Sequence, residues 1–205
     1  GIETASYGAD FDNGYRLIDL LEALDKRKSC RRIRLGSLEP RTITEEFCLR
    51  ASKLPNLCPH FHLSLQSGCD KTLQNMNRHY SAAQYKQACD LLRQYMPLCG
   101  LTTDLIVGFP GETEEEFAQT LEFVKKAQFL MIHVFPYSKR QGTPAATMSG
   151  QVPEDIKRRR TATLINLASQ IRTEILKHMV GQQEERTVLF ETYANGYAKG
   201  HTADF

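Results

Sequence analysis

The sequence predicts an α/β fold in which short parallel strands alternate with amphipathic helices, as in a parallel barrel or a doubly wound sheet. Strand-like apolar stretches recur at 31–37, 60–66, 102–107 and 131–135. The segments between them repeat apolar residues at helical spacing and begin with capping residues. In both architectures ligands bind at the carboxyl ends of the strands, and this indicates where a site should lie.

One strand and four helices can be predicted from the order of residues along the chain. The stretch at 60–66 alternates most cleanly, because Phe61 and Leu63 face one way while His60 and His62 face the other. Helices are expected at about 14–27, after Thr42 with Glu45, after the capping box of Ser81 and Gln84, and after that of Thr113 and Glu116.

The pattern changes after residue 140. Pro153 is expected at the first position of a long helix that ends at Gly181. A β-rich segment at 187–192 and a glycine-containing tail follow it. We therefore expect one domain over 1–180 and the beginning of a small all-β module over 181–205.

The composition is that of an ordinary globular chain. Of the 205 residues, 41% are hydrophobic and 24% are charged, and the net charge is +2. No apolar run is long enough to span a membrane, and the first residues lack the regions of a secretory signal. The six cysteines lie at least ten residues apart, which is too far for a zinc or iron–sulfur motif. We expect reduced thiols in a cytoplasmic protein.

Polar residues stand where consecutive strands end. Glu39 follows the first strand, Gln66 the second, and Arg78 comes shortly after it, while Asp104 lies on the polar side of the third. Each alone is typical of a turn or a surface. Together they offer acceptors for a ribose or an amine and a cation for a carboxylate, so they predict a shared ligand site.

Several segments resemble the radical S-adenosylmethionine methylthiotransferases. They are Arg-Ile-Arg-Leu-Gly-Ser-Leu-Glu-Pro at 32–40, His-Phe-His-Leu-Ser-Leu-Gln-Ser-Gly at 60–68, Met-Asn-Arg at 76–78, Asp-Leu-Ile-Val-Gly-Phe-Pro-Gly-Glu-Thr at 104–113 and Tyr-Ser-Lys-Arg-Gln-Gly-Thr at 137–143. The match covers essentially the whole chain in order.

The resemblance implies a partial, TIM-like β/α barrel, truncated at its N-terminus, that holds S-adenosylmethionine across its mouth. It places Glu39, Gln66, Arg78 and Asp104 among the contacts to the methionyl or ribose portions, as in the related oxygen-independent coproporphyrinogen oxidases. It also implies that 181–205 begins a TRAM-like RNA-binding β module.

The implied partner is tRNA. On this interpretation the basic run Lys157, Arg158, Arg159 and Arg160, which could otherwise be a solvated helix face, becomes a set of phosphate contacts.

The family has branches that act on threonylcarbamoyladenosine in tRNA, on isopentenyladenosine in tRNA and on a ribosomal-protein aspartate. Glu39 and the segment 133–140 look most like the threonylcarbamoyladenosine branch. The isopentenyladenosine branch more often has His-Pro at the position of Glu39 and Pro40, and it is the alternative.

The chain departs from the family in one respect. The Cys-x-x-x-Cys-x-x-Cys motif for the radical-generating cluster does not occur, nor do the cysteines of the family's N-terminal domain. Residues 1–7 look like the end of the third barrel strand, so the ligands of both 4Fe-4S clusters are expected upstream, in the full-length parent. This chain alone is expected to be inactive and to self-associate through an unpaired sheet edge.

Two other classes of function remain open from the residues. An ordinary β/α-barrel lyase or hydrolase could use His60, His62 and Asp104 as metal ligands or acid–base groups. A third hypothesis is an RNA-binding or scaffold module that lacks a cluster.

Overall fold

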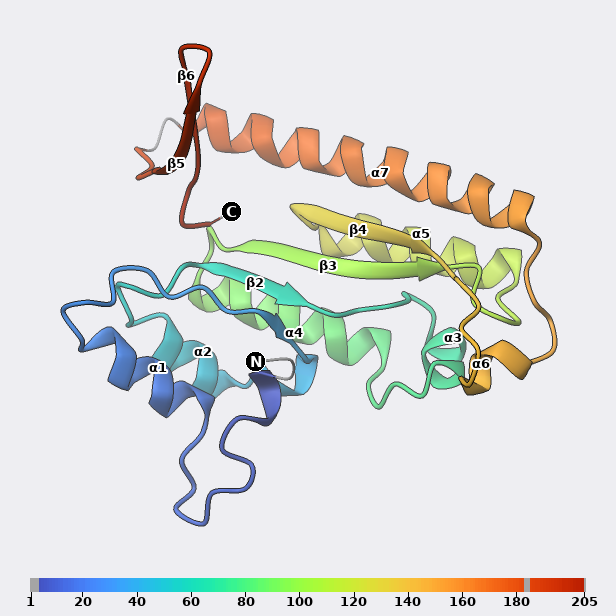
Figure 1. Ribbon diagram of the computed structural model, residues 1–205, viewed down its shortest axis with the longest axis horizontal. Coiled ribbons are helices and arrows are strands. Elements are labelled where there is room, and N and C mark those ends of the chain that lie inside the picture. The colour runs from blue at the N-terminus through green and yellow to red at the C-terminus, as the bar shows by residue number, and fades with distance from the viewer. Residues whose placement is uncertain (1–3, 183–184, 205) are drawn as a thin grey trace.

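The computed structural model describes residues 4–182 and 185–204. Its centre is a sheet of four parallel strands in the order β1-β2-β3-β4, so each strand pairs with the next one along the chain (Figure 1). The strands are Ser37–Leu38 (β1), His60–Leu63 (β2), Gly100–Val107 (β3) and Met131–Pro136 (β4). Sequential parallel order with helical crossovers is the arrangement of a partial β/α barrel, and the predicted fold class is confirmed.

Helices connect the strands and form a second layer. The α-helices are α1 Leu17–Asp25, α2 Glu45–Ala51, α3 Asp70–Asn75, α4 Ala82–Tyr95, α5 Glu114–Ala127, α6 Pro144–Thr147 and α7 Glu154–Gly181. The capping boxes at Ser81 and Thr113 form as predicted and begin α4 and α5. Helix α4 packs between α2 and α5, so these three helices lie side by side (Figure 1).

The two faces of the sheet differ. Phe61, Leu63 and Leu105 are buried and point toward the helices. Tyr85 of α4 reaches the same face, where its hydroxyl donates to the carbonyl oxygen of Leu63 at 2.7 Å. Because side chains alternate along a strand, His62 and its neighbours on the adjoining strands occupy the opposite face, which is only partly buried.

The C-terminal part begins with α7, which packs on β4 and α5 (Figure 1). A separate antiparallel hairpin follows, made of β5 (Leu189–Ala194) and β6 (Tyr197–His201). Asn195 and Gly196 both have positive φ, as a tight two-residue hairpin turn requires. Arg32 and Arg34 donate hydrogen bonds to backbone carbonyls of 187 and 201–203, so the hairpin segment is fastened to the segment that precedes β1.

Two predicted strands differ from the structure. Of the stretch at 31–37, only Ser37 belongs to a strand, and Ile33 makes one isolated bridge to Leu57. Thr4–Ser6 is a 3-10 turn rather than the end of a barrel strand, and residues 1–3 lie outside the described residues. Both segments flank the β1 edge, where a strand has a pairing partner on one side at most, so local hydrogen bonds prevail.

No helix in the described part of the chain is long and apolar enough to cross a membrane.

Candidate functional site

A cavity of about 440 Å³ opens at the carboxyl ends of β3 and β4. Gln66 and Asp104 line it together with aromatic residues and Arg140. Two of the four residues predicted to share a ligand site therefore meet in one cavity, at the edge of the sheet where parallel α/β folds bind ligands.

Gln66 is held in an unusual backbone conformation just after β2. Its φ is 71°, in the left-handed region that residues other than glycine adopt at a cost. Its N–H donates to the carbonyl oxygen of Asp104 at 2.9 Å, and its carbonyl accepts from the N–H of Ile106 at 2.9 Å. These two bonds fix the backbone of Gln66 beside β3, and its side chain lines the cavity.

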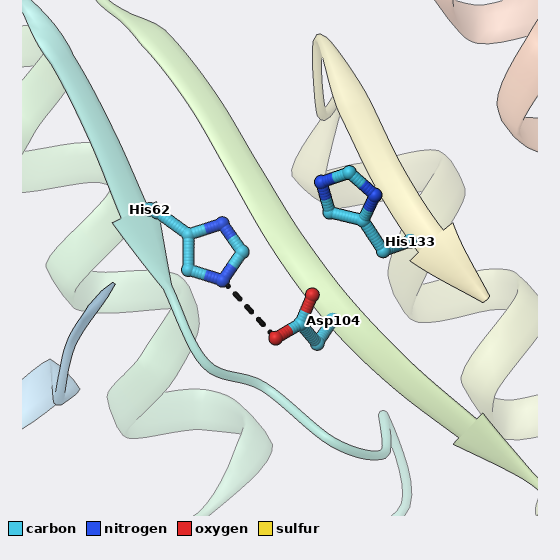
Figure 2. Close-up of side chains that lie close together, drawn as sticks. All are labelled: His62, Asp104 and His133. Atoms are coloured by element: carbon cyan, nitrogen blue, oxygen red, sulfur yellow. Dashed lines mark hydrogen bonds and ion pairs between the residues drawn. The ribbon is translucent and has the colours of Figure 1, made fainter. Parts of the chain in front are cut away.

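Asp104 belongs to a three-residue group on the open face of the sheet (Figure 2). His62 on β2 and His133 on β4 flank it, and the ligand atoms of the three residues all lie within 4.8 Å of one another. His62 Nε2 and Asp104 Oδ2 are 3.2 Å apart, and His62 Nδ1 lies 3.0 Å from Thr102 Oγ1. Two imidazoles and a carboxylate can hold a divalent transition metal or can form a hydrogen-bonded network.

His60 is not part of this group, although the metal hypothesis paired it with His62. Its Nε2 lies 3.3 Å from Thr102 Oγ1, and its side chain is buried. Burial, helped by the charges of Arg34 and His62, lowers the pKa of His60 to about 4, so the ring is neutral at pH 7. His133, which the sequence reasoning missed, takes the third position because it pairs with Asp104 in the sheet register.

Glu39 and Arg78 lie outside the cavity lining, beside Tyr80. Burial raises the pKa of Tyr80 to about 12, and the charges of Arg78 and Glu39 act on it in opposite directions. Glu39 pairs with Arg41 at 2.6 Å. Arg78 Nε is buried without a hydrogen-bond partner in the part of the chain described, which leaves one donor for a ligand.

The basic run is divided by burial. Lys157 and Arg160 are 5% and 3% exposed, whereas Arg158 and Arg159 are exposed. Arg160 Nη1 donates to Glu112 Oε2 at 2.6 Å and to the carbonyl oxygen of Glu112 at 3.1 Å. Arg160 thus fastens α7 to the loop after β3, whereas Lys157 pairs with Glu154 of its own helix at 2.7 Å. Of the two exposed cations, Arg159 pairs with Glu114 at 2.6 Å, and the side chains of both Arg158 and Arg159 reach the surface.

Glu112, which the sequence reasoning did not single out, organises that loop. Its Oε2 also accepts from the N–H of Gly108 at 2.7 Å, and the side chain is 1% exposed. Burial raises the pKa of Glu112, while the bond from Gly108 and the charge of Arg160 oppose the rise. The loop after β3, which begins beside the cavity, is therefore held by a buried ion pair.

The cysteines do not fit an iron–sulfur cluster. All six are free thiols. Burial raises the pKa of Cys48 to about 11 and those of Cys89 and Cys99 to about 12, which disfavours the thiolates that bind iron. Within the described ranges the only metal-ligating group is that of His62, Asp104 and His133. By contrast, the amide of Gln66 and the carboxylate of Asp104 in the cavity lining fit the polar parts of S-adenosylmethionine.

Comparison with known proteins agrees with these features. A model of the radical SAM superfamily matches residues 3–124. The chain is 39% identical over 193 residues to the threonylcarbamoyladenosine tRNA methylthiotransferase MtaB of Thermotoga maritima, with 94% of this chain and 44% of the relative covered. MtaB of Bacillus subtilis is 37% identical, with 97% and 47% covered.

A second class of relative is equally similar. The tRNA-2-methylthio-N(6)-dimethylallyladenosine synthase of Saccharopolyspora erythraea is 38% identical, with 92% of this chain and 38% of the relative covered. The chain spans less than half the length of each of these relatives. The relatives reported above are named as tRNA methylthiotransferases, and the chain itself belongs to the radical SAM superfamily.

Proposed function

We propose that this chain is part of a cytoplasmic tRNA-modifying enzyme that methylthiolates threonylcarbamoyladenosine next to the anticodon. The observation that carries tRNA methylthiolation is the identity of 37–39% to tRNA methylthiotransferases of both classes over nearly the whole chain, joined to a ligand cavity at the predicted strand ends. Glu39 and the segment 133–140 support this branch over the dimethylallyladenosine synthases, which are the alternative.

In this proposal the described residues bind and orient S-adenosylmethionine. Gln66 and Asp104 supply acceptors for its ribose hydroxyls or its ammonium group, and Arg78 supplies a cation for its carboxylate. Glu39 lies on the neighbouring β/α unit and is the fourth contact. With a 4Fe-4S cluster as its reductant, bound S-adenosylmethionine would supply the radical chemistry that removes a hydrogen from the adenine ring of the substrate.

The cluster ligands belong, in this proposal, to the full-length parent, because the cysteines of this chain do not fit them. This chain alone is then inactive and forms part of the surface that positions the reactants. Residues 1–180 are assigned to the barrel, and 181–205 to the beginning of a TRAM-like RNA-binding module. Exposed Phe190, Tyr193 and Tyr197 of the hairpin, with Arg158 and Arg159, are the groups available for bases and phosphates.

Nucleoside mass spectrometry of tRNA tests the proposal, with and without the full-length parent gene in the source cell. We expect loss of the methylthio form of threonylcarbamoyladenosine alone. Loss of the methylthio isopentenyl form would instead keep the reaction and correct the branch. No change in either nucleoside would contradict the proposal and favour the ribosomal-protein substrate or the cluster-less RNA-binding module.

A further inference from the structure

Besides Gln66 and Asp104, the cavity wall carries a group of aromatic side chains. The rings of Phe109 and Tyr137 meet edge to face, with centroids 5.3 Å apart and planes at 73°. The ammonium group of Lys157 lies 5.5 Å from the centroid of Tyr137 and is itself buried. Phe135, also in the wall, is 50% exposed. Flat apolar side chains held in place in this way suit the face of a purine.

Arg140 lines the same cavity and is the cation of its lining, where Asp104 is the carboxylate. A turn fixes its backbone, because Thr143 donates to the carbonyl oxygen of Arg140 from its N–H at 3.3 Å and from its hydroxyl at 2.8 Å. Gly142 completes the turn with a φ of 82°. Over the described ranges no carboxylate forms an ion pair with Arg140, in contrast to Arg159 and Arg160, which both pair with Glu114.

A second polar group in this wall lacks a partner. The hydroxyl of Tyr137 is buried and makes no hydrogen bond within the described part of the chain. A buried donor left in this state costs free energy unless a ligand or water satisfies it. The wall therefore offers an aromatic surface, an open hydroxyl and an open guanidinium, and this set fits a base that carries a polar, negatively charged substituent.

We infer that Arg140 selects the substrate of this site by pairing with the carboxylate of the threonylcarbamoyl group, while the aromatic wall receives the adenine. The inference rests on the proposed function. A guanidinium binds a carboxylate through two parallel hydrogen bonds, and an isopentenyl group has nothing to offer it. An apolar substituent in this cavity would desolvate Arg140 without compensation, so the same residue favours one substrate and disfavours the other.

The test uses the full-length parent enzyme with its clusters and two tRNAs, one carrying threonylcarbamoyladenosine and one carrying isopentenyladenosine. In the wild type, kcat/KM should favour the threonylcarbamoyl substrate. We expect Arg140→Gln to lower that kcat/KM by about 10- to 100-fold, mainly through KM, as loss of a charge-assisted hydrogen bond does. Arg140→Lys should restore part of the loss. Lys139→Gln, which changes an exposed neighbouring cation outside the lining, is the matched control and should act like the wild type.

Measuring the Kd for tRNA distinguishes loss of the charge of Arg140 from a general disturbance of the structure. For tRNA carrying threonylcarbamoyladenosine, the Kd of Arg140→Gln should be higher than that of the wild type. For tRNA carrying the neutral methyl ester of this nucleoside, the Kd should already be high in the wild type and should change little in Arg140→Gln. Equal activity of Arg140→Gln and the wild type on the threonylcarbamoyl substrate would overturn the role of Arg140 and leave the proposed function intact. A wild type that modifies only the isopentenyl substrate would overturn the proposed branch itself.

Discussion

The buried ion pair of Glu112 and Arg160 should contribute to the stability of the fold. Removing one member of such a pair leaves the other charged and buried, so we expect Arg160→Ala to lower the free energy of unfolding by about 3–5 kcal/mol. The paired change Glu112→Gln with Arg160→Met should recover a large part of that loss. Arg158→Ala removes an exposed neighbouring cation and should stay within about 0.5 kcal/mol of the wild type. Urea titrations of all four proteins measure these differences, and a small effect of Arg160→Ala would contradict the burial of its charge.

His60 makes stability depend on pH. Its folded-state pKa of about 4 lies below its ordinary value of 6.5, so between these values the unfolded chain binds the proton more readily. Stability is therefore expected to fall as pH drops from 6.5 toward 4. His60→Gln should make this dependence shallower, whereas His79→Gln, at an exposed histidine, should leave it unchanged. Urea midpoints at pH 7 and pH 5 measure both, and identical pH dependence in the wild type and His60→Gln would contradict the burial of a neutral ring.

The positions of the site residues were only partly predictable from the sequence. The grouping of Gln66 and Asp104 could be predicted because both stand where strands end. The burial of Lys157 and Arg160 could not, because Glu112, which pairs with Arg160, lies 48 residues away in the sequence. His133 joins Asp104 through the register of β3 with β4, and register is set by contacts between strands rather than by either segment alone.

Among the elements, helices were more predictable than strands. The starts of α4 and α5 follow from the capping residues Ser81 and Thr113, whose hydrogen bonds lie within three residues. The stretch at 31–37 has the alternation of a strand, yet β1 has only two residues. An alternating pattern shows which side chains can face the core. A strand forms only if a neighbouring strand also offers backbone groups for hydrogen bonding.

The loop after β2 packs closely against α5, and Gly68 allows it. A Cβ at this position would lie 2.7 Å from Cβ of Phe123 and 2.8 Å from Cα of Thr120. We expect Gly68→Ala to lower the free energy of unfolding by about 1–3 kcal/mol, because backbone must shift to make room. Gly181→Ala is the matched control, since nothing lies within 4 Å of its Cβ, and it should raise stability by about 0.5 kcal/mol. Thermal unfolding that moves both variants in the same direction would contradict the close packing.

At the scale of the whole molecule, the sheet has two edge strands, β1 and β4. We expect the isolated chain to self-associate through an edge, because unpaired strand backbone is a template for pairing with another copy. Sedimentation velocity over a range of concentrations measures this, with mass rising as concentration rises. A clean monomer at high concentration would contradict it.

We propose that the strand-end residues of this chain hold S-adenosylmethionine in a methylthiotransferase that acts on threonylcarbamoyladenosine. The most direct measurement is nucleoside mass spectrometry of tRNA from cells that lack the full-length parent gene and are complemented with the wild type or with Asp104→Asn. We expect the wild type to restore the methylthio form of threonylcarbamoyladenosine, and Asp104→Asn to accumulate to the same level and restore little of it. Full restoration by Asp104→Asn would rule out a role for Asp104 in binding S-adenosylmethionine. The absence of any methylthio nucleoside that depends on the gene would rule out the methylthiotransferase function.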